Sequence, residues 1–431
     1  MDLLEKLGKI WQGLDYPFLV GNDVELRFSE IGSQSPVDLT AIKKGDVVAL
    51  IGDFDPASIL TFLRLIGLGA TVVPLTASTV ADHEYFFESA LVDWVIDGQT
   101  ISRRIHDRKN PLLEELARLE HSGLVLFSTG TTARPKAILH DMTAFLAKFE
   151  TPRPTLRTLN FLLFDHIGGI NTLLHTMFNR GVVISPESRT VDSILATSAK
   201  YHAELIPTTP TFMRMILMSG AVPDRIPDCV KLITYGTELM DQQTLTEYCR
   251  LLPNVDFRQT YGMSELGIVR AKSEDRCSLF MRIGGEGVET KIVDNVLHIR
   301  SKSRMLGYLN AASPFDEEGW YCTSDIVAVK GEYFKIVGRT SDVVNVGGLK
   351  FMSSEVEQVA LGYPGVELVK VEGKNNPITG QHVELKVQPA VNSSFELTDF
   401  REFLQARLQS HMVPRRIAVE SIAVGHRFKK V

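Results

Sequence analysis

The chain has 431 residues, of which 44% are hydrophobic and 23% charged, and its formal net charge is −6. This composition is typical of a globular protein with two or three folded units, and the mild acidity argues against nucleic acid or an anionic membrane as the main partner. No run approaches the ~20 apolar residues that a membrane span requires, and the N-terminal segment lacks the apolar block of a signal peptide. We therefore expect a cytoplasmic protein.

Cysteine usage gives no sign of a metal site or of a disulfide framework. The four cysteines, Cys229, Cys249, Cys277 and Cys322, have neither C-x-x-C spacing nor a zinc-like spacing with histidine. We expect all four to be thiols in a reducing compartment.

Short runs rich in valine, isoleucine and leucine alternate with amphipathic segments over the N-terminal part of the chain. We expect strands at residues 47–51, 71–74, 123–127, 158–163, 181–184 and 231–235. We expect helices at residues 56–67, 170–178, 191–201, 210–218 and 241–252. Alternation of this kind predicts mainly parallel sheets with helices on both faces.

After residue 284 the pattern changes to short strands separated by glycine and aspartate turns. Strands expected at 288–293, 296–301, 321–329 and 333–337 indicate an antiparallel, barrel-like β region. A smaller unit follows, with strands at 343–346, near 366–372 and at 383–388, and helices at 353–361 and 397–411. The predicted fold is α/β: a large N-terminal body of mainly parallel sheets with helices plus a β-barrel-like region, residues 1–340, and a small α+β C-terminal lid, residues 341–431.

The strand expected at 123–127 runs into a loop that crowds hydroxyls, a glycine and a lysine together. Hydroxyls and exposed backbone N–H groups can surround phosphate oxygens, and a lysine adds a positive charge. A polar surface turn is the alternative, since such residues are common in turns. A Walker P-loop is not matched, because Pro135 replaces its second glycine and Ala137 its magnesium-binding hydroxyl. The loop reads Ser128-Thr129-Gly130-Thr131-Thr132-Ala133-Arg134-Pro135-Lys136.

This loop resembles the phosphate loop of the adenylate-forming superfamily, which comprises acyl-CoA synthetases, peptide-synthetase adenylation domains and luciferases. In that family the loop ends in G-x-P-K-G, and here Ala133 and Ala137 stand in place of the two glycines. The resemblance implies that Lys136 is catalytic and that the loop binds the phosphates of ATP through Ser128, Thr129, Gly130, Thr131 and Thr132. Further matches reach residue 429, so the resemblance covers nearly the whole chain.

Residues 259–265, Gln-Thr-Tyr-Gly-Met-Ser-Glu, are similar to the family motif Y-G-x-T-E. The match implies that the ring of Tyr261 packs on adenine beside Gly262, that the Ser264 hydroxyl meets the α-phosphate, and that Glu265 holds Mg²⁺. An aromatic face suits a purine and a carboxylate suits a hard cation. A purely structural turn is the alternative for a Tyr-Gly pair considered alone.

Residues 319–325 resemble the family motif G-W-x-x-T-G-D, with Ser324 in place of its glycine, and residues 338–342 resemble G-R-x-D-D. The resemblance implies that Asp325 and Arg339 bind the ribose of the nucleotide. It also implies a hinge at Ser341, about which the C-terminal lid is mobile. Weaker matches at residues 284–288 and 305–308 lie on the β region.

Near the chain end the family carries a lysine that bridges the substrate carboxylate and the phosphate during adenylation. The register from residues 414–417 onward places Lys429 at this position, preceded by Phe428 where glycine is usual. The neighbouring Lys430 makes a lysine pair, which at a tail is otherwise typical of solvated surface. The resemblance implies that Lys429 is catalytic.

Residues 164–170, Phe-Asp-His-Ile-Gly-Gly-Ile, are similar to a family segment that reads F-H-x-x-G. The match implies that His166 lines the acyl pocket near the carboxylate, although a histidine packed in the core fits the same pattern. With the register shifted by one residue, Asp165 would hold the ammonium of an amino acid, but the His-Ile-Gly-Gly pattern favours an acid without an amino group. We expect the remaining walls of the acyl pocket to be formed by residues 207–218 and by Tyr235, Gly236, Thr237 and Glu238. The last four residues are also expected to touch adenine.

The resemblance implies an enzyme that uses ATP and Mg²⁺ to activate a small carboxylic acid as an acyl-AMP, with release of pyrophosphate. The acyl group then passes to a thiol, either CoA or the phosphopantetheine of an acyl carrier protein. For this step a turn at Gly347 and Gly348 is expected beside the acyl-adenylate, since glycines let a pantetheine chain approach closely. Two alternatives remain: a free-standing amino-acid-adenylating enzyme, and a catalytically impaired relative, for which Ala133, Ala137, Ser324 and Phe428 are the grounds.

Overall fold

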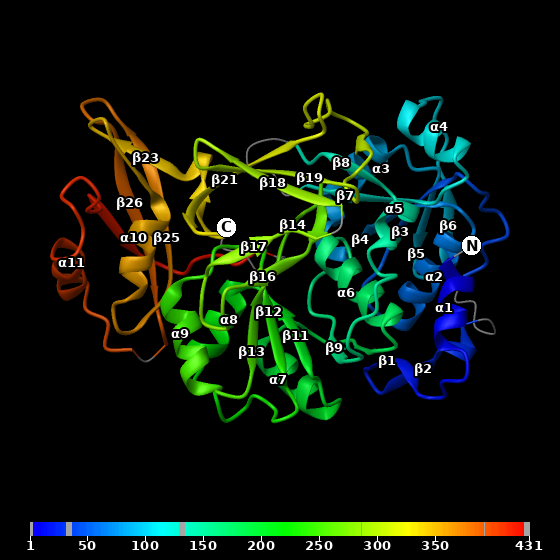
Figure 1. The fold of residues 1–431 in the computed structure, drawn as a ribbon, viewed down its shortest axis with the longest axis horizontal. Helices are drawn as coiled ribbons and strands as arrows, with labels where there is room; N and C mark the ends of the chain where they lie inside the picture. The colour runs from blue at the N-terminus through cyan, green and yellow to red at the C-terminus, as the bar shows by residue number, and fades with distance from the viewer. Residues whose placement is uncertain (1–2, 32–36, 129–133, 286, 392, 426–431) are drawn as a thin grey trace.

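Two seven-stranded sheets form the centre of the N-terminal body in the computed structural model, which describes residues 3–31, 37–128, 134–285, 287–391 and 393–425 (Figure 1). The first sheet has the order β13-β12-β11-β9-β10-β1-β2 and is parallel except at its β2 edge. Its strands are β1 (Pro17–Gly21), β2 (Val24–Arg27), β9 (Arg157–Leu159), β10 (Val182–Ile184), β11 (Leu205–Thr208), β12 (Leu232–Tyr235) and β13 (Asp256–Gln259).

The second sheet has the order β20-β8-β7-β4-β3-β5-β6 and is parallel only from β7 to β5. Its outer strands pair antiparallel, so the sheet is mixed rather than parallel throughout. Its strands are β3 (Val47–Ile51), β4 (Thr71–Leu75), β5 (Trp94–Asp97), β6 (Thr100–Arg103), β7 (Gly123–Phe127), β8 (Ala137–Asp141) and β20 (Gly307–Tyr308).

The barrel-like β region expected after residue 284 is a six-stranded antiparallel sheet with the order β16-β17-β22-β21-β19-β18, and it lies beside a short β14–β15 ribbon. The pairing of β21 with β22 sets Asp325 opposite Arg339. The strands are β14 (Tyr261–Met263), β15 (Gly267–Val269), β16 (Ala271–Ser273), β17 (Met281–Ile283), β18 (Val288–Val293), β19 (Val296–Ser301), β21 (Tyr321–Lys330) and β22 (Tyr333–Arg339).

The C-terminal unit has its own sheet, of order β24-β23-β26-β25 with β27 beside β26. Its buried apolar residues form a cluster that contains, among the described residues, only side chains from Val344 onward. Figure 1 shows this sheet beside the body, with α10 and β25 on the side of α8 and α9. The strands are β23 (Val343–Val346), β24 (Leu349–Met352), β25 (Val366–Asn376), β26 (Gly380–Pro389) and β27 (Arg416–Val419).

Helices pack on the sheets where the sequence supplies a cap and an apolar face. Asp55 accepts a hydrogen bond from the Ser58 N–H, and Pro56 occupies the first turn of α2, where its missing donor costs nothing. The described α-helices are α1 (Leu3–Trp11), α2 (Pro56–Gly67), α3 (His83–Ala90), α4 (Pro111–Arg118), α5 (Met142–Ala147), α6 (Ile167–Phe178), α7 (Val191–Lys200), α8 (Pro210–Met218), α9 (Gln242–Leu251), α10 (Ser353–Leu361) and α11 (Leu397–Gln405). The described 3₁₀ helices are η1 (Phe28–Glu30), η2 (Ala77–Asp82), which is kinked at Thr79, and η3 (Thr340–Asp342).

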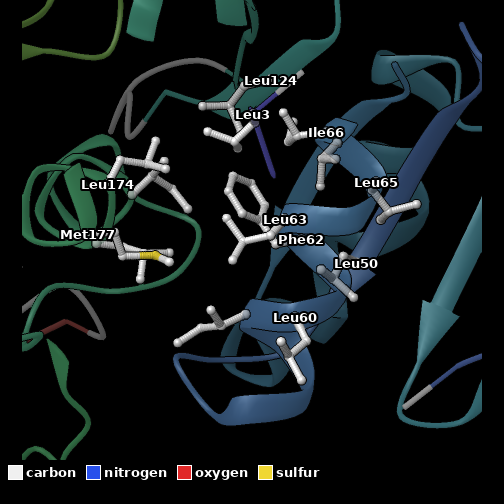
Figure 2. Packing of buried hydrophobic residues seen from close by; sticks show 14 of the residues in the cluster. Leu3, Leu50, Leu60, Phe62, Leu63, Leu65, Ile66, Leu124, Leu174 and Met177 are labelled. Atoms are coloured by element: carbon white, nitrogen blue, oxygen red, sulfur yellow. The ribbon is translucent and has the colours of Figure 1, made fainter. Parts of the chain in front are cut away.

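The largest apolar cluster joins α2 and α6 to the second sheet. Figure 2 shows Phe62 and Leu63 of α2 pointing toward Leu174 and Met177 of α6. Burial of such side chains stabilises the fold by roughly 1.5–3 kcal/mol each. The cluster fixes α6, and α6 in turn fixes the position of His166 at its start.

Two expected elements are shorter in the structure. The strand expected at 158–163 ends at Leu159: the Asn160 N–H makes the last bond of the β9–β10 ladder, to the Ile184 carbonyl, and residues 160–166 form the loop before α6. The helix expected at 397–411 ends at Gln405. Beyond it the Arg407 N–H bonds the carbonyl three residues back, that of Leu404, as in a 3₁₀ turn, and not the carbonyl four residues back.

The expectation of four free thiols is wrong for one pair. Cys249 in α9 and Cys277 form a disulfide with a Cα–Cα distance of 6.1 Å, whereas Cys229 and Cys322 are free. The two residues are 28 positions apart and meet only because the chain after β16 folds back along α9. Local spacing therefore could not reveal the pair.

None of the helices in the described ranges is both long and apolar enough to cross a bilayer.

Candidate active site

A cavity of about 440 Å³ lies between the body and the C-terminal unit. The body contributes the start of α8, the segments after β12 and β13, the middle of β21 and the end of β22, and the C-terminal unit contributes α10 and β25. Three motifs that are far apart in the sequence therefore meet at one place. The expected site residues on its wall are Thr237, Glu238, Tyr261, Gly262, Asp325 and Arg339.

Asp325 is the polar centre of this cavity, and only 4% of its surface is exposed. Its Oδ2 accepts a hydrogen bond from the Tyr261 hydroxyl at 2.5 Å, and its Oδ1 accepts one from Nε of Arg339 at 3.1 Å. Burial raises the pKa of the Asp325 carboxyl, and the nearby guanidinium opposes that shift. Each carboxylate oxygen keeps a further lone pair, so the group can still accept a hydroxyl donor.

The turn after β12 brings the backbone close to the next strand. A side chain on Gly236 would place its Cβ 2.3 Å from Oγ1 of Thr260, so only glycine fits there. Thr237 has a φ of +71°, which is rare for a β-branched residue and is typical of functional turns. Glu238 accepts a hydrogen bond from the Thr211 N–H at 3.2 Å. Tyr235 does not reach the cavity, because its ring is 1% exposed in the core behind the sheet.

The expected phosphate loop connects β7 to β8, which pair antiparallel through Phe127 and Ala137. At its two ends Oγ of Ser128 accepts a hydrogen bond from the Lys136 N–H at 3.0 Å, and the Ser128 N–H bonds the Lys136 carbonyl at 3.0 Å. The loop is thus closed at its base. Thr129, Gly130, Thr131, Thr132 and Ala133 lie outside the described residues.

Tyr308, which the sequence marked only as a weak match, links two expected catalytic residues. Its hydroxyl donates to Oε1 of Glu265 at 2.8 Å, and Nζ of Lys136 lies 4.8 Å from the centre of its ring. Burial and the neighbouring carboxylate raise the pKa of the Tyr308 phenol, so it remains a donor. The phosphate-loop cation and the carboxylate expected to bind metal are therefore held side by side.

His140 on β8 is a second residue that the sequence did not indicate. Its Nε2 lies 2.7 Å from the carbonyl oxygen of Ser264, to which it must donate because a carbonyl only accepts. Burial lowers the pKa of His140 to about 4, so the ring is neutral near pH 7. The imidazole thus fixes the backbone of the segment that carries Ser264 and Glu265.

His166 begins α6 as its N-cap, and its Nδ1 accepts a hydrogen bond from the Gly168 N–H at 3.1 Å. The neighbouring Asp165 is 6% exposed and lies in the loop between β9 and α6. A side chain on Gly169 would meet the Leu163 carbonyl at 2.1 Å, which accounts for glycine in this tight turn. The capping bond fixes the orientation of the His166 ring.

The C-terminal features lie at two different places. Ser341 is in η3, the connection between β22 of the body and β23 of the C-terminal sheet, and its hydroxyl donates to Asp342 at 2.9 Å. Gly347 and Gly348, with φ of 62° and 89°, form the exposed two-residue turn between β23 and β24 and do not line the cavity. Phe428, Lys429 and Lys430 lie outside the described residues.

The carboxylate of Glu265 has the oxygen ligands that a magnesium ion prefers. Its Oε2 accepts no hydrogen bond from any described residue, while Oε1 is held by Tyr308. Across the described ranges, no group of three or more His, Cys, Asp or Glu side chains gathers to hold a metal. A single carboxylate, completed by phosphates and water, is how proteins commonly bind Mg²⁺.

Both the fold and the site define a nucleotide-dependent enzyme with two units around one cavity. The family model described as AMP-binding enzyme matches residues 39–309. The chain therefore belongs to the AMP-binding enzyme family, as its motifs led us to expect.

Known relatives and solved structures resemble the chain over most of its length. A feruloyl-CoA synthase from an Amycolatopsis species is 23% identical over 87% of this chain and 85% of its own. The 2-succinylbenzoate–CoA ligase of Bacillus licheniformis is 23% identical over the same shares of the two chains. The anthranilate CoA ligase AuaEII, solved with anthranoyl-AMP, is 17% identical and superimposes with a TM-score of 0.82 over 100% of this chain and 95% of its own.

Proposed function

We propose that the protein is an AMP-forming acid–thiol ligase that activates a carboxylic acid as an acyl-AMP and then transfers the acyl group to CoA. The convergence of Asp325, Arg339, Tyr261 and Glu238 on one cavity is the observation that carries this proposal. Membership of the AMP-binding family and the CoA ligases among its relatives support it.

In the first half-reaction the carboxylate attacks the α-phosphorus of ATP, the P–O bond to the pyrophosphate breaks, and pyrophosphate leaves. Asp325 and Arg339 hold the ribose, and Thr237 and Glu238 lie against adenine. Glu265 would hold Mg²⁺, which neutralises phosphate charge when bound. Lys136, the loop that follows Ser128, and Lys429 stabilise the charge that develops on the oxygens.

The hydrogen bond between Tyr261 and Asp325 bears on the role of the tyrosine. The ring is 6% exposed and its hydroxyl is bound to the carboxylate, so we propose that Tyr261 orients Asp325 and offers only a ring edge to the base. His140 positions Ser264, whose hydroxyl would meet the α-phosphate.

In the second half-reaction a thiol attacks the acyl carbon, the thioester C–S bond forms, and AMP departs with the electrons of the cleaved C–O bond. We propose that residues 341–431 act as a lid that turns about Ser341, because that residue lies on the connection between the two units. This rotation of the lid would bring Gly347 and Gly348 beside the acyl-adenylate. Their exposed position outside the cavity fits the adenylating orientation of the lid.

We propose an aromatic acid without an amino group as the substrate, since named relatives are ligases for ferulate, 2-succinylbenzoate and phenylacetate. His166 would line the acyl pocket at the start of α6. A carrier-protein phosphopantetheine remains the second candidate for the thiol. We propose a cytoplasmic location, where ATP and CoA are available.

ATP–pyrophosphate exchange across a panel of aromatic, aliphatic and amino acids tests this proposal. Exchange with aromatic acids, followed by CoA-dependent AMP release, is the expected result. Exchange with amino acids alone would instead identify an amino-acid-adenylating enzyme. Exchange with no acid, in protein that binds ATP, would identify a catalytically impaired relative and overturn the proposal.

A further inference from the structure

The orientation of the C-terminal unit is held by one buried arginine of the body. Arg214 lies in α8 and is 7% exposed. Its Nε donates to the Glu367 carbonyl at 2.8 Å, and its Nη2 donates to the carbonyls of Val366 at 2.7 Å and Leu361 at 3.2 Å. All three acceptors belong to the C-terminal unit, so three of the five guanidinium donors depend on the position of that unit.

The remaining donors are held by the body itself. Nη1 donates to Oγ1 of Thr244 at 3.0 Å and lies 3.7 Å from Oδ1 of Asp241, and both residues are at the start of α9. Thr244 and Asp241 therefore keep the guanidinium plane aimed at the C-terminal unit. A planar group fixed in this way recognises only acceptors that arrive in one arrangement.

Two of the three carbonyls lie where a regular element ends or is interrupted. Leu361 is the last residue of α10, where helix carbonyls lack internal partners, and a cation there also offsets the negative end of the helix dipole. Glu367 lies where the β25–β26 register shifts, so its carbonyl is outside the regular ladder. A rotation of the C-terminal unit would expose these carbonyls and the buried guanidinium together.

Arg214 is also connected to the nucleotide side of the cavity. One helical turn earlier, the Thr211 N–H donates to Glu238, whose turn is expected against adenine. Thr211, Arg214, Glu238 and Asp241 all line the cavity. Helix α8 therefore contacts the adenine turn with its first residues and the C-terminal unit with its middle.

We propose that Arg214 is a positioning residue that holds the C-terminal unit in the adenylating orientation and so favours acyl-AMP formation over thioester formation. The assignment of this orientation to adenylation depends on the proposed function. We assign Arg214 no contact with the reacting atoms. It acts through the three carbonyls, which a second orientation of the unit would have to release.

The test compares Arg214→Ala with wild type and with Arg250→Ala, a matched control on the surface of α9. Among the described residues, the Arg250 guanidinium pairs only with Glu247. Nitroxide labels at exposed Asp224 and Glu402, introduced as unnatural amino acids, report the distance between body and C-terminal unit without any substrate. We expect a narrow distance distribution in wild type and in Arg250→Ala, and a broader or shifted one in Arg214→Ala. An unchanged distribution in Arg214→Ala would overturn the proposal.

Half-reaction rates provide the second readout. We expect ATP–pyrophosphate exchange to fall at least roughly tenfold in Arg214→Ala, as for loss of a charged hydrogen bond, while thioester formation from preformed acyl-AMP is unchanged or faster. An equal fall in both rates would identify a purely structural role.

Circular dichroism checks that the variant folds. If the alanine variant does not fold, Arg214→Lys keeps the charge without the planar fork and should change the distance and the rate ratio in the same direction. If wild type itself shows no exchange, the proposed function fails, but the distance measurement still decides the role of Arg214.

Discussion

The Tyr308 hydroxyl donates a hydrogen bond to Oε1 of Glu265 at 2.8 Å, and this contact connects β20 to the turn between β14 and β15, from residues 43 positions apart. The same ring lies 4.8 Å from the ammonium of Lys136. The tyrosine therefore fixes the separation between the carboxylate proposed to hold Mg²⁺ and the cation of the phosphate loop.

Tyr308→Phe removes the hydroxyl and keeps the ring beneath Lys136. Because Glu265 loses a hydrogen bond to its charged form, we expect ATP–pyrophosphate exchange to fall roughly tenfold and the half-saturating Mg²⁺ concentration to rise. Exchange measured during a Mg²⁺ titration checks this. Tyr333→Phe, a half-buried tyrosine on β22, is the control that should change neither value; an unaltered Mg²⁺ dependence in Tyr308→Phe would contradict the role of the contact.

The N-terminal body could be predicted from the sequence because its signals are local. The helices expected at 56–67 and 210–218 are confirmed as α2 and α8, and each begins with a proline that follows a capping residue, Asp55 or Thr209. The turn at Gly347 and Gly348 was likewise predicted, from two adjacent glycines after the valine-rich run at 343–346.

The contacts that complete the site could not be predicted, because each joins segments distant in the chain. His140 bonds Ser264 across 124 positions, and Arg214 reaches Leu361 across 147. The disulfide between Cys249 and Cys277 depends on the same kind of tertiary meeting. Their residue types carry no local pattern, so only the fold shows them.

Ser324 has a φ of +61°, in the left-handed region that favours glycine. The family motif has glycine there, and the chain keeps the conformation at the cost of strain. We expect Ser324→Gly to raise the free energy of unfolding by roughly 0.5–1 kcal/mol, measured by urea denaturation. Ser324→Ala keeps a Cβ and should give no such gain. Equal stability of the two variants would show that the position is not strained.

Because of the low pKa of His140, we expect the free energy of unfolding to decrease in acid. Burial lowers its pKa from 6.5 to about 4, so the unfolded chain binds this proton more tightly than the folded one. The corresponding stability is fully present above pH 6.5 and is lost as the pH falls toward 4, by roughly 3 kcal/mol in total.

His140→Gln preserves a donor toward the Ser264 carbonyl and cannot titrate. We expect its free energy of unfolding to decrease less than that of wild type between pH 7 and pH 4, by roughly 3 kcal/mol. Urea denaturation of both proteins at several pH values measures the difference. Parallel pH dependences would show that His140 does not contribute.

Lys429→Ala tests most directly whether two parts of one mobile C-terminal unit serve the two half-reactions in turn. With the acid found in the exchange panel, acyl-AMP formation should fall by roughly 10²–10³, because one charge-stabilising contact is lost in the transition state. Thioester formation from preformed acyl-AMP and CoA should continue at nearly the wild-type rate, since the Gly347–Gly348 turn and not Lys429 would then face the adenylate. An equal loss of both rates in a folded variant would contradict the account.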